Sequence, residues 1–337
     1  MKLLSVIVPC YNSSGYMRHC IDTLLFGGEA VEIIIVNDGS TDNTSAIAEE
    51  YQRKYPKIVN VVHQANKGHG GAINSGLQKA SGMYVKIVDS DDWVDAGSYK
   101  RIIKTISSFS PESMPDALIS NYVYEKLEKR RKTVISYSGT LPEGCLFTWN
   151  EVGQFQLGRY MLMHAIIYKR DVLCKSELLL PENTFYVDNI YAYLPLAYVE
   201  TMYYLNVNFY RYFIGREGQS VQEKTMIKRI DQQLTVNKLM IESVNLNDIS
   251  CDKKRIYLMH YLEIVTAISS ILLLKEGSRT SMKNKDELWE FIRKKDAAVY
   301  NELRKNIIGK ILHLQTPVGR LIAIATYKIS RMIVGFS

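Results

Sequence analysis

The chain has 337 residues, of which 47% are apolar and 23% charged, with 42 basic against 35 acidic side chains. This composition excludes disordered, collagen-like and disulfide-scaffold classes, and the length predicts two domains or one large domain with an appendage. No stretch of about 18 apolar residues is free of charge, which excludes a conventional multi-span membrane protein. Residues 290–337 carry nine Lys and Arg against three acids, so we expect a locally basic tail and no nucleic-acid binding.

The cysteine pattern and the N-terminal residues bear on the compartment. The five cysteines are odd in number and contain no CxxC motif. The first nine residues have a short apolar run but no small-residue cleavage site, which is typical of a first strand and not of a signal peptide. Reduced thiols without an export signal predict a cytoplasmic protein.

The first hundred residues alternate between strand-like and helix-like patterns. Continuous β-branched apolar runs predict strands at 3–8, 31–36, 58–62 and 84–88. Helical spacing and capping residues predict helices at 16–26, at 44–55, after the glycine-rich loop 67–71, and from Asp95 to about 107. This β-α repeat predicts an α/β fold with a parallel sheet and helices on both faces. Ligands of such sheets bind beyond the carboxyl ends of the strands.

The rest of the chain is less regular. A basic stretch at 126–132 is expected to be a solvated hairpin or loop. Residues 150–225 are rich in tyrosine and end in a strand-like run at 202–213, after which the pattern is mainly helical.

Three carboxylates, Asp89, Asp91 and Asp92, directly follow the fourth expected strand. Because they repel one another, a bound divalent cation would stabilise them. Hard oxygen ligands suit Mg²⁺ or Mn²⁺, held by one or two carboxylates together with substrate phosphates. The alternative is a solvated turn in which one aspartate caps the next helix. The position at a strand end, on the same edge as the other loops, favours the metal.

Three further loops at this edge carry groups that can recognise a nucleotide. Tyr11 offers an aromatic face to a base, and Asp38 offers an acceptor for a base N–H or a ribose hydroxyl. In the loop Gly68-His69-Gly70-Gly71, glycines let backbone N–H groups approach an anion. The alternatives are ordinary turns, a helix cap by Asp42 and a solvated His69. Together the four loops predict a nucleotide-diphosphate site. Since the G-x-G-x-x-G fingerprint is missing, a nicotinamide cofactor is not expected.

Four segments carry a resemblance to a known family: residues 6–12 (VIVPCYN), 36–42 (VNDGSTD), 66–77 (NKGHGGAINSGL) and 88–93 (VDSDDW). In this order and at this spacing they resemble the bacterial family 2 glycosyltransferases with the GT-A fold. The third segment departs from the commoner form, which has Ala-Arg-Asn where this chain has Ala72-Ile73-Asn74. The resemblance covers about the first 107 residues. It implies a Rossmann-like mixed sheet that binds a nucleotide-diphospho-sugar.

The resemblance also implies a donor site, a metal and inversion at the anomeric carbon. The donor is a nucleotide-sugar, usually linked to UDP. Asp91 is implied as the principal ligand of Mn²⁺ or Mg²⁺, Asp89 contacts the ribose or the metal, and Asp92 supports either. By motif match, the donor-binding residues, of which the first three hold base and ribose, are Pro9, Tyr11, Asp38, Asn66, Gly68, Asp89, Ser90 and Asp91.

Inversion needs a general base that deprotonates the acceptor hydroxyl. The family carries it as an aspartate in a later, aromatic-flanked acidic motif, and the best match is residues 181–189 (PENTFYVDN). This match gives Asp188 as the base, although the usual Glu-Asp is here Val187-Asp188. Glu182 is the alternative. Two arginines lie in a segment that resembles the family's closure over the diphosphate, where they contact phosphate or form a structural ion pair: Arg211 and Arg216.

The resemblance and the patterns together predict two domains. We expect a GT-A catalytic domain at 1–225, with a nucleotide-sugar-binding half at 1–107 and an acceptor half at 108–225, and a mainly helical region at 226–337. The basic, amphipathic tail, residues 303–337, fits an in-plane helix on an anionic membrane. A helix packed on the catalytic domain fits almost equally well.

The sequence thus predicts a metal-dependent inverting glycosyltransferase of the hexosyltransferase type. It is expected to move a sugar from a nucleotide-sugar to a glycan or lipid-linked acceptor in the synthesis of capsule, exopolysaccharide or another cell-surface glycan. Its expected place is the cytoplasm, peripheral to the inner face of the cell membrane. One alternative is a sugar nucleotidyltransferase, whose glycine-rich signature is missing after the first strand. Another is an inactive partner or scaffold subunit of a polysaccharide assembly complex, which would have lost its carboxylates.

Overall fold

The computed structural model describes residues 2–126, 132–155, 160–215, 219 and 222–312. Contacts within the chain divide it into two compact units. The first comprises residues 1–154 and 161–216, and the second comprises residues 155–160 and 217–337. The boundary expected at residue 225 thus lies a few residues earlier, and the sequence gives no sign that the short segment 155–160 joins the second unit.

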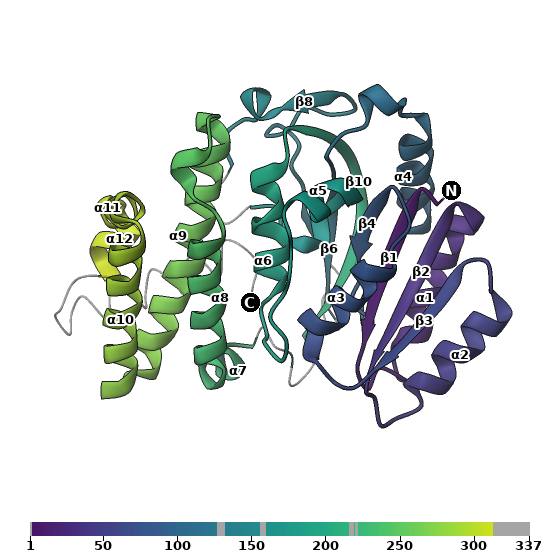
Figure 1. The fold of residues 1–337 in the computed structure, drawn as a ribbon, viewed down its shortest axis with the longest axis horizontal. Helices are drawn as coiled ribbons and strands as arrows, with labels where there is room; N and C mark the ends of the chain where they lie inside the picture. The colour runs from purple at the N-terminus through teal and green to yellow at the C-terminus, as the bar shows by residue number, and fades with distance from the viewer. Residues whose placement is uncertain (1, 127–131, 156–159, 216–218, 220–221, 313–337) are drawn as a thin grey trace. The chain divides into compact units, whose positions relative to one another are not determined.

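The first unit is built on a mixed sheet (Figure 1) with the strand order β3-β2-β1-β4-β9-β6-β10-β5, to which β7 and β8 add as partners of β6 and β10. Its strands are β1 (Leu4–Cys10), β2 (Val31–Asp38), β3 (Val59–Gln64), β4 (Tyr84–Ile87), β5 (Trp93–Val94), β6 (Ala117–Lys126), β7 (Thr133–Ile135), β8 (Leu146–Thr148), β9 (Ile166–Lys169) and β10 (Thr201–Ile214). Its helices are α1 (Met17–Leu24), α2 (Thr44–Lys54), α3 (Gly68–Lys79), α4 (Ala96–Ser108), α5 (Arg170–Lys175) and α6 (Asp188–Tyr193).

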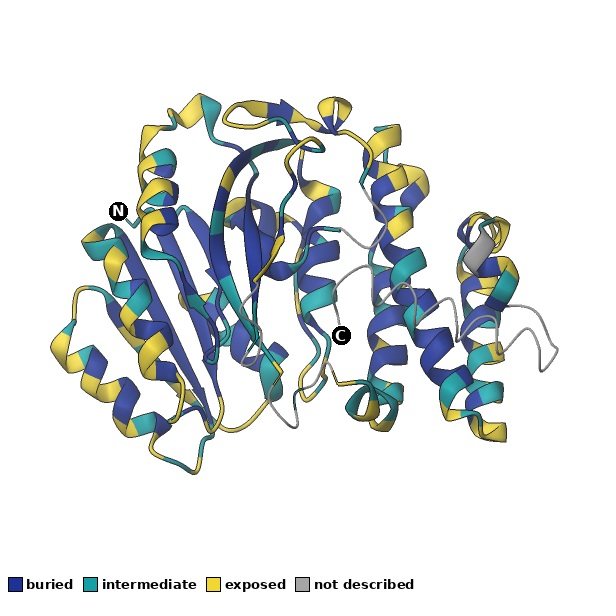
Figure 2. Cartoon of the chain, turned by 180° about the vertical axis from the view of Figure 1, so that it is seen from behind, coloured by how far each residue is buried: buried dark blue, intermediate teal, exposed yellow. Residues whose placement is uncertain are grey.

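The four strands expected in the first hundred residues are confirmed and pair in parallel. β1 lies between β2 and β4, with Leu4 opposite both Val31 and Tyr84, and β2 pairs with β3. Every residue of β1, β2 and β4 is buried, as continuous β-branched runs require. In Figure 2 the central strands of the sheet are almost wholly buried, whereas the helices over them have exposed outer faces. The outer strand β3 is mostly half-buried or exposed. The predicted cap at Asp95 is present, since its side chain accepts a hydrogen bond from Ser98 N.

The second half of the sheet sets the direction of the later strands. β9 is antiparallel to both β4 and β6, and β10 is parallel to β6. The carboxyl ends of β1, β2, β4, β6 and β10 therefore share one edge. The expected strand at 202–213 is confirmed as β10. The basic stretch connects β6 to its antiparallel neighbour β7, and residues 127–131 lie outside the described residues.

The second unit is helical in its described part. Its helices are α7 (Glu223–Lys228), α8 (Ile230–Ser243), α9 (Asp252–Glu276), α10 (Arg279–Lys295), α11 (Ala297–Lys305) and α12 (Ile307–Leu312). By length and composition α9 would suffice to cross a membrane, but 67% of its most apolar window is buried inside the protein, as in a core helix. Most of the tail expected at 303–337 lies outside the described residues.

Candidate active site

The loop after β1 presents an aromatic ring to solvent. Pro9 lies buried within β1, and Tyr11, two residues further on, is 54% exposed. Asn12 adopts a positive φ of 49°. Its Oδ1 accepts a hydrogen bond from Thr41 N at 2.9 Å, and its own N–H donates to Ser40 Oγ at 3.0 Å. These bonds join the loops after β1 and β2, so the Tyr11 ring stands at the rim of the sheet.

Asp38 ends β2 and is buried. Its Oδ1 accepts hydrogen bonds from Gln64 Nε2 at 2.7 Å and from Lys67 N at 2.9 Å. The carboxylate therefore connects the end of β3 to the glycine-rich loop. A nucleotide at this carboxylate would share it with two protein donors. Asp42 is bound within its own turn and accepts hydrogen bonds from Thr44 N and Ser14 N.

The glycine-rich loop packs directly on the segment that precedes Asp188. A Cβ on Gly68, whose φ is +73°, would lie 2.9 Å from Asn183 Cα, and one on Gly70 would lie 2.4 Å from Pro181 O. Lys67 O accepts a hydrogen bond from Asn183 N at 2.6 Å. The glycines are thus explained by close backbone packing. Gly68 N donates to the Oδ1 of Asn66, which is exposed.

Two more contacts hold the same segment against α3. Asn74 Nδ2 donates to Leu180 O at 2.8 Å, and Asn74 Oδ1 accepts from Leu180 N at 3.0 Å. Lys67 Nζ pairs with Glu182 Oε1 at 3.0 Å, and both side chains are about half exposed. Asn74 thus acts as a clamp on the backbone, and Glu182 is a surface acid in an ion pair.

The carboxylates that follow β4 differ in their surroundings. Asp89 Oδ1 forms a hydrogen bond with His69 Nε2 at 2.8 Å. Asp92 is 1% exposed, and its oxygens accept from Tyr210 Oη at 2.6 Å and from Phe213 N at 2.7 Å. Ser90 and Ser13 share a hydrogen bond of 2.8 Å between their hydroxyls. Asp91 is partly exposed.

These environments shift the pKa values in different directions. Burial raises the pKa of Asp92 well above its ordinary value, and the charge of Asp89 adds to this effect. Burial alone would raise the pKa of Asp89, but the charge and hydrogen bond of His69 bring that pKa below its ordinary value. Burial opposes the imidazolium of His69, yet Asp89 raises its pKa overall. His69 and Asp89 therefore favour the ionised pair.

Asp188 is the first residue of α6, and its carboxyl interacts electrostatically with His69 and Asp89. Burial raises the pKa of its carboxyl, while the charge of His69 lowers it and that of Asp89 raises it again. The backbone just before it is strained, with a positive φ of 68° at Tyr186. Val187 is completely buried. The departure from the usual acidic pair therefore places an apolar side chain in the core and leaves Asp188 as the one carboxylate of the pair.

Three residues near the carboxylates were not foreseen from the sequence: Lys86, His164 and Tyr210. Lys86 is completely buried in β4, and its Nζ donates to the carbonyls of Met163, His164 and Ile166 at 2.7, 2.7 and 3.1 Å. Its position inside the apolar run of β4 was an available signal, because a lysine is almost never fully buried without partners. His164 carries no such local signal. Tyr210 lies beside Arg211 in the segment that resembles the family's closure over the diphosphate, but its contact with Asp92 was not expected.

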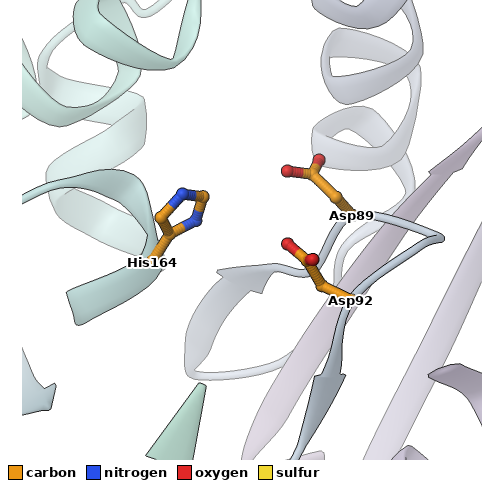
Figure 3. A group of neighbouring side chains, drawn as sticks. All are labelled: Asp89, Asp92 and His164. Carbon is orange, nitrogen blue, oxygen red and sulfur yellow. The ribbon is translucent and has the colours of Figure 1, made fainter. Parts of the chain in front are cut away.

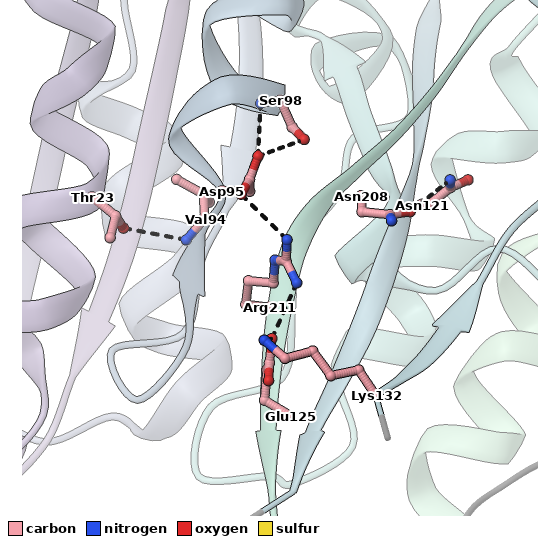
Figure 4. Close-up of polar contacts among 9 residues, drawn as sticks. All are labelled: Thr23, Val94, Asp95, Ser98, Asn121, Glu125, Lys132, Asn208 and Arg211. Atoms are coloured by element: carbon pink, nitrogen blue, oxygen red, sulfur yellow. Dashed lines mark hydrogen bonds and ion pairs between the residues drawn. The ribbon is translucent and has the colours of Figure 1, made fainter. Parts of the chain in front are cut away.

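Arg211 forms a structural ion pair and not a free cation at the edge of the sheet. Its guanidinium lies 3.1 Å from Glu125 Oε1 and 3.3 Å from Asp95 Oδ2 (Figure 4). Asp95 also caps α4 through Ser98, so the arginine links β10 to β6 and to the start of α4. Of the two alternatives for Arg211, the ion pair is the one present. Arg216 lies outside the described residues.

The acidic residues fit a divalent cation. Among the described residues, one ligand atom each from Asp89, Asp92 and His164 lies within 4.8 Å of the others. Asp91 follows Asp89 by two residues on the same loop. Carboxylate oxygens suit Mg²⁺ and Mn²⁺, and an imidazole nitrogen is also accepted by the first-row transition metals. Asp89, one of the two ligands expected from the sequence, is one of these three residues, whereas Asp91, the other, is not among them.

Known proteins share both the sequence and this fold. Residues 5–169 match the model of the glycosyl transferase family 2. YibD of Escherichia coli (strain K12), named an uncharacterized glycosyltransferase, is 29% identical over 260 residues, which are 75% of this chain and 74% of YibD. GgaB of Bacillus subtilis (strain 168), named a minor teichoic acid biosynthesis protein, is 35% identical over 31% of this chain and 11% of its own length.

A solved structure of S. aureus TarS, residues 1–349 in complex with UDP-GlcNAc, superimposes with a TM-score of 0.70 at 22% identity, covering 98% of this chain and 91% of that one. This likeness shows the fold, and the expected GT-A architecture with a helical C-terminal region is confirmed. The chain is an enzyme of the glycosyltransferase class that acts on nucleotide-sugars. Residues 5–169, nearly half of the chain, form a glycosyltransferase family 2 domain.

Proposed function

We propose that this enzyme is a metal-dependent inverting glycosyltransferase that transfers a hexosyl group from a UDP-sugar to a hydroxyl of a glycan or lipid-linked acceptor. The observation that carries the proposal is the placement of Asp188. Its carboxyl has a raised pKa and interacts electrostatically with His69 and Asp89 at the edge of the sheet where the donor motifs end. A carboxylate in that position can serve as the base, and the acids after β4 can serve the leaving diphosphate.

The donor would bind across the ends of β1, β2 and β4. The exposed Tyr11 ring offers a stacking face for the base. Asp38 offers an acceptor for the base or ribose, although it also holds the glycine-rich loop. By the family match, the further donor contacts are Pro9, Asn66, Gly68, Asp89, Ser90 and Asp91.

Asp89 and Asp91 would hold the Mn²⁺ or Mg²⁺ ion, which, when bound, neutralises charge on the leaving diphosphate. Asp188 takes the proton from the acceptor hydroxyl while the oxygen of that hydroxyl forms a bond to C1 of the sugar. The bond from C1 to the diphosphate oxygen breaks on the opposite side, so the anomeric configuration inverts. The transition state has oxocarbenium character, by analogy with glycoside hydrolysis. A raised pKa brings the base closer to the operating pH and makes it more effective.

We further propose that the acceptor belongs to a cell-surface polysaccharide and that the enzyme works at the inner face of the cell membrane. The teichoic acid name of GgaB supports the first part. The basic last turns of α10 and α11, with Arg293, Lys294 and Lys295 and with Arg304 and Lys305, support the second part. Such side chains are attracted to anionic lipid headgroups.

The test is donor hydrolysis and donor binding by the full chain. The protein is incubated with UDP-, GDP- and dTDP-sugars in Mn²⁺, Mg²⁺ or EDTA, and free nucleotide is measured. We expect EDTA-sensitive release from a UDP-sugar. If no donor released free nucleotide and no nucleotide-sugar bound detectably, the proposal would be refuted and an inactive partner subunit would be favoured.

The role of Asp188 is tested with a matched pair of variants. Asp188→Asn should keep donor affinity and lose at least about a hundredfold in transfer, the usual contribution of a general base. Glu182→Gln, which changes an exposed acid in the same segment, should transfer normally. Equal activity of Asp188→Asn and the wild type would remove Asp188 from the mechanism.

A further inference from the structure

His164 faces Asp89 and Asp92, but it comes from a later part of the chain than these two acids. It lies in the short 3₁₀ turn Met163–Ala165, just before β9, whereas Asp89 and Asp92 follow β4. In Figure 3 a ring nitrogen of His164 points toward the two carboxylates. One ligand atom from each of the three residues lies within 4.8 Å of the other two. None of the four family motifs in the sequence includes this histidine.

The histidine has a polar atom that the protein itself does not satisfy. The residue is only 6% exposed, and its Nδ1 has no hydrogen-bond partner among the described residues. A buried polar atom without a partner costs about 1–3 kcal/mol, so such atoms call for an explanation. The atom is part of a ring that faces two carboxylates, and it forms a hydrogen bond with neither of them. A cation between the three residues would satisfy it.

The surroundings hold the ring in place. The backbone of the turn is fixed by Lys86, whose Nζ donates hydrogen bonds to the carbonyls of Met163, His164 and Ile166. The ring is stacked on Tyr210 with centroids 4.6 Å apart and tilted against Tyr212 at 4.4 Å. Tyr210 also donates to Asp92. The nitrogen and the carboxylate are therefore positioned by one shared aromatic side chain, as is usual around metal ligands.

We propose that His164 is a nitrogen ligand of the divalent cation, together with Asp89 and Asp92, and that it makes the site prefer Mn²⁺ over Mg²⁺. This assignment rests on the proposed function and adds a ligand from the acceptor half. Metal bonds of about 2.1 Å place two ligand atoms at most about 4.2 Å apart. The bound of 4.8 Å that encloses the three ligand atoms is compatible with this spacing. The oxygens of Asp92 accept one hydrogen bond each and keep a lone pair for the cation.

The preference for Mn²⁺ follows from the ligand chemistry. Mg²⁺ is a small hard ion that is bound through oxygen and keeps several waters. Imidazole raises affinity for the first-row transition ions relative to Mg²⁺. Asp91, at the partly exposed side of the loop, would hold the same cation on the side of the donor phosphates.

The experiment is pulsed EPR of Mn²⁺ bound to the full chain with UDP, which detects ¹⁴N nuclei coordinated to the ion. His164→Phe keeps an aromatic ring in the same packing and removes the nitrogen. His164→Asn offers an amide oxygen near the position of the ring nitrogen. The matched control is His63→Phe, a partly exposed histidine at the end of β3. Mn²⁺ and UDP affinities are measured on the same samples.

We expect ¹⁴N coupling in the wild type and in His63→Phe, and its loss in both His164 variants. Mn²⁺ affinity should fall at least about tenfold in His164→Phe, the lower end for groups that only support metal ligands. His164→Asn should recover binding and reduce the preference for Mn²⁺ over Mg²⁺. Coupling that survives in His164→Asn, or Mn²⁺ bound to the wild type without ¹⁴N coupling, would refute the ligand and leave the proposed function standing. No Mn²⁺ binding in a protein that still binds UDP would refute the metal dependence itself.

Discussion

Replacing Lys86 by methionine removes three buried hydrogen bonds and keeps most of the side-chain volume. Lys86 is completely buried, and its Nζ donates to three backbone carbonyls at 2.7, 2.7 and 3.1 Å. Only the ammonium form has three N–H donors, so at about 1 kcal/mol net for each bond the variant should lose about 3 kcal/mol in free energy of unfolding relative to protonated Lys86. With a urea m-value of about 2 kcal/mol/M, the unfolding midpoint of the first unit should fall by about 1.5 M.

The assay is urea unfolding followed by tryptophan fluorescence in a Trp289→Phe background. That background leaves Trp93 and Trp149, both in the first unit, as the reporters. Lys79→Met, at an exposed lysine that ends α3, is the control for the loss of a positive charge. A change below about 1 kcal/mol in Lys86→Met would refute the reasoning, because the carbonyls would then have found other partners.

The same variant has a predicted pH signature. Burial lowers the pKa of Lys86 well below its ordinary value of 10.5, against the raising effect of Asp89 and Asp92. The unfolded chain then binds more protons than the folded one, so wild-type stability should rise with pH up to about 10.5. Lys86→Met should lack this component of the slope. An identical pH dependence in the two proteins would contradict the lowered pKa.

Three further outcomes are expected. Gly70→Ala should lower kcat about tenfold or more, because the new Cβ would lie 2.4 Å from Pro181 O and displace the segment before Asp188. The control is Gly15→Ala, whose Cβ has nothing within 4 Å and which should leave kcat unchanged. The acid limb of log kcat/KM should lie above the ordinary aspartate range, because activity needs ionised Asp188 and burial raises its pKa; a limb below about pH 4 would contradict this. The pKa of Asp42 is lowered to about 2, because hydrogen bonds from Thr44 and Ser14 outweigh the effect of burial. In thermal unfolding, Asp42→Asn should therefore be less stable than the wild type above about pH 4, and the two proteins should become equally stable near pH 2.

The nucleotide-binding half was predictable because its signals are local. Each buried strand is a continuous apolar run, and each polar loop follows its strand directly in the sequence. Asp38, Asp89 and Tyr11 could therefore be placed on one edge of the sheet from the order of runs and loops alone. The helix cap at Asp95 was equally local, and its hydrogen bond to Ser98 N is present.

The contacts around Asp188 and His164 were not predictable in this way. Asn74 contacts Leu180, and Lys86 contacts His164, across 106 and 78 residues of sequence. No periodicity or spacing rule connects positions so far apart. The glycines at 68 and 70 were interpreted as an anion site, and only the packing shows that their Cα atoms face the backbone of the 181–183 segment.

The contacts also connect the donor half of the sheet to the later segments that carry His164 and Asp188. Lys67, the first residue of the glycine-rich loop, donates its N–H to Asp38, and its carbonyl accepts a hydrogen bond from Asn183 N. β4 carries both Lys86, which positions the turn of His164, and the loop of Asp89. The acids on the donor side and the proposed base are thus positioned by shared backbone contacts. Gly70→Ala, at a position that is not among the proposed donor contacts, should therefore alter the distance between base and donor. It should lower kcat before it weakens donor affinity.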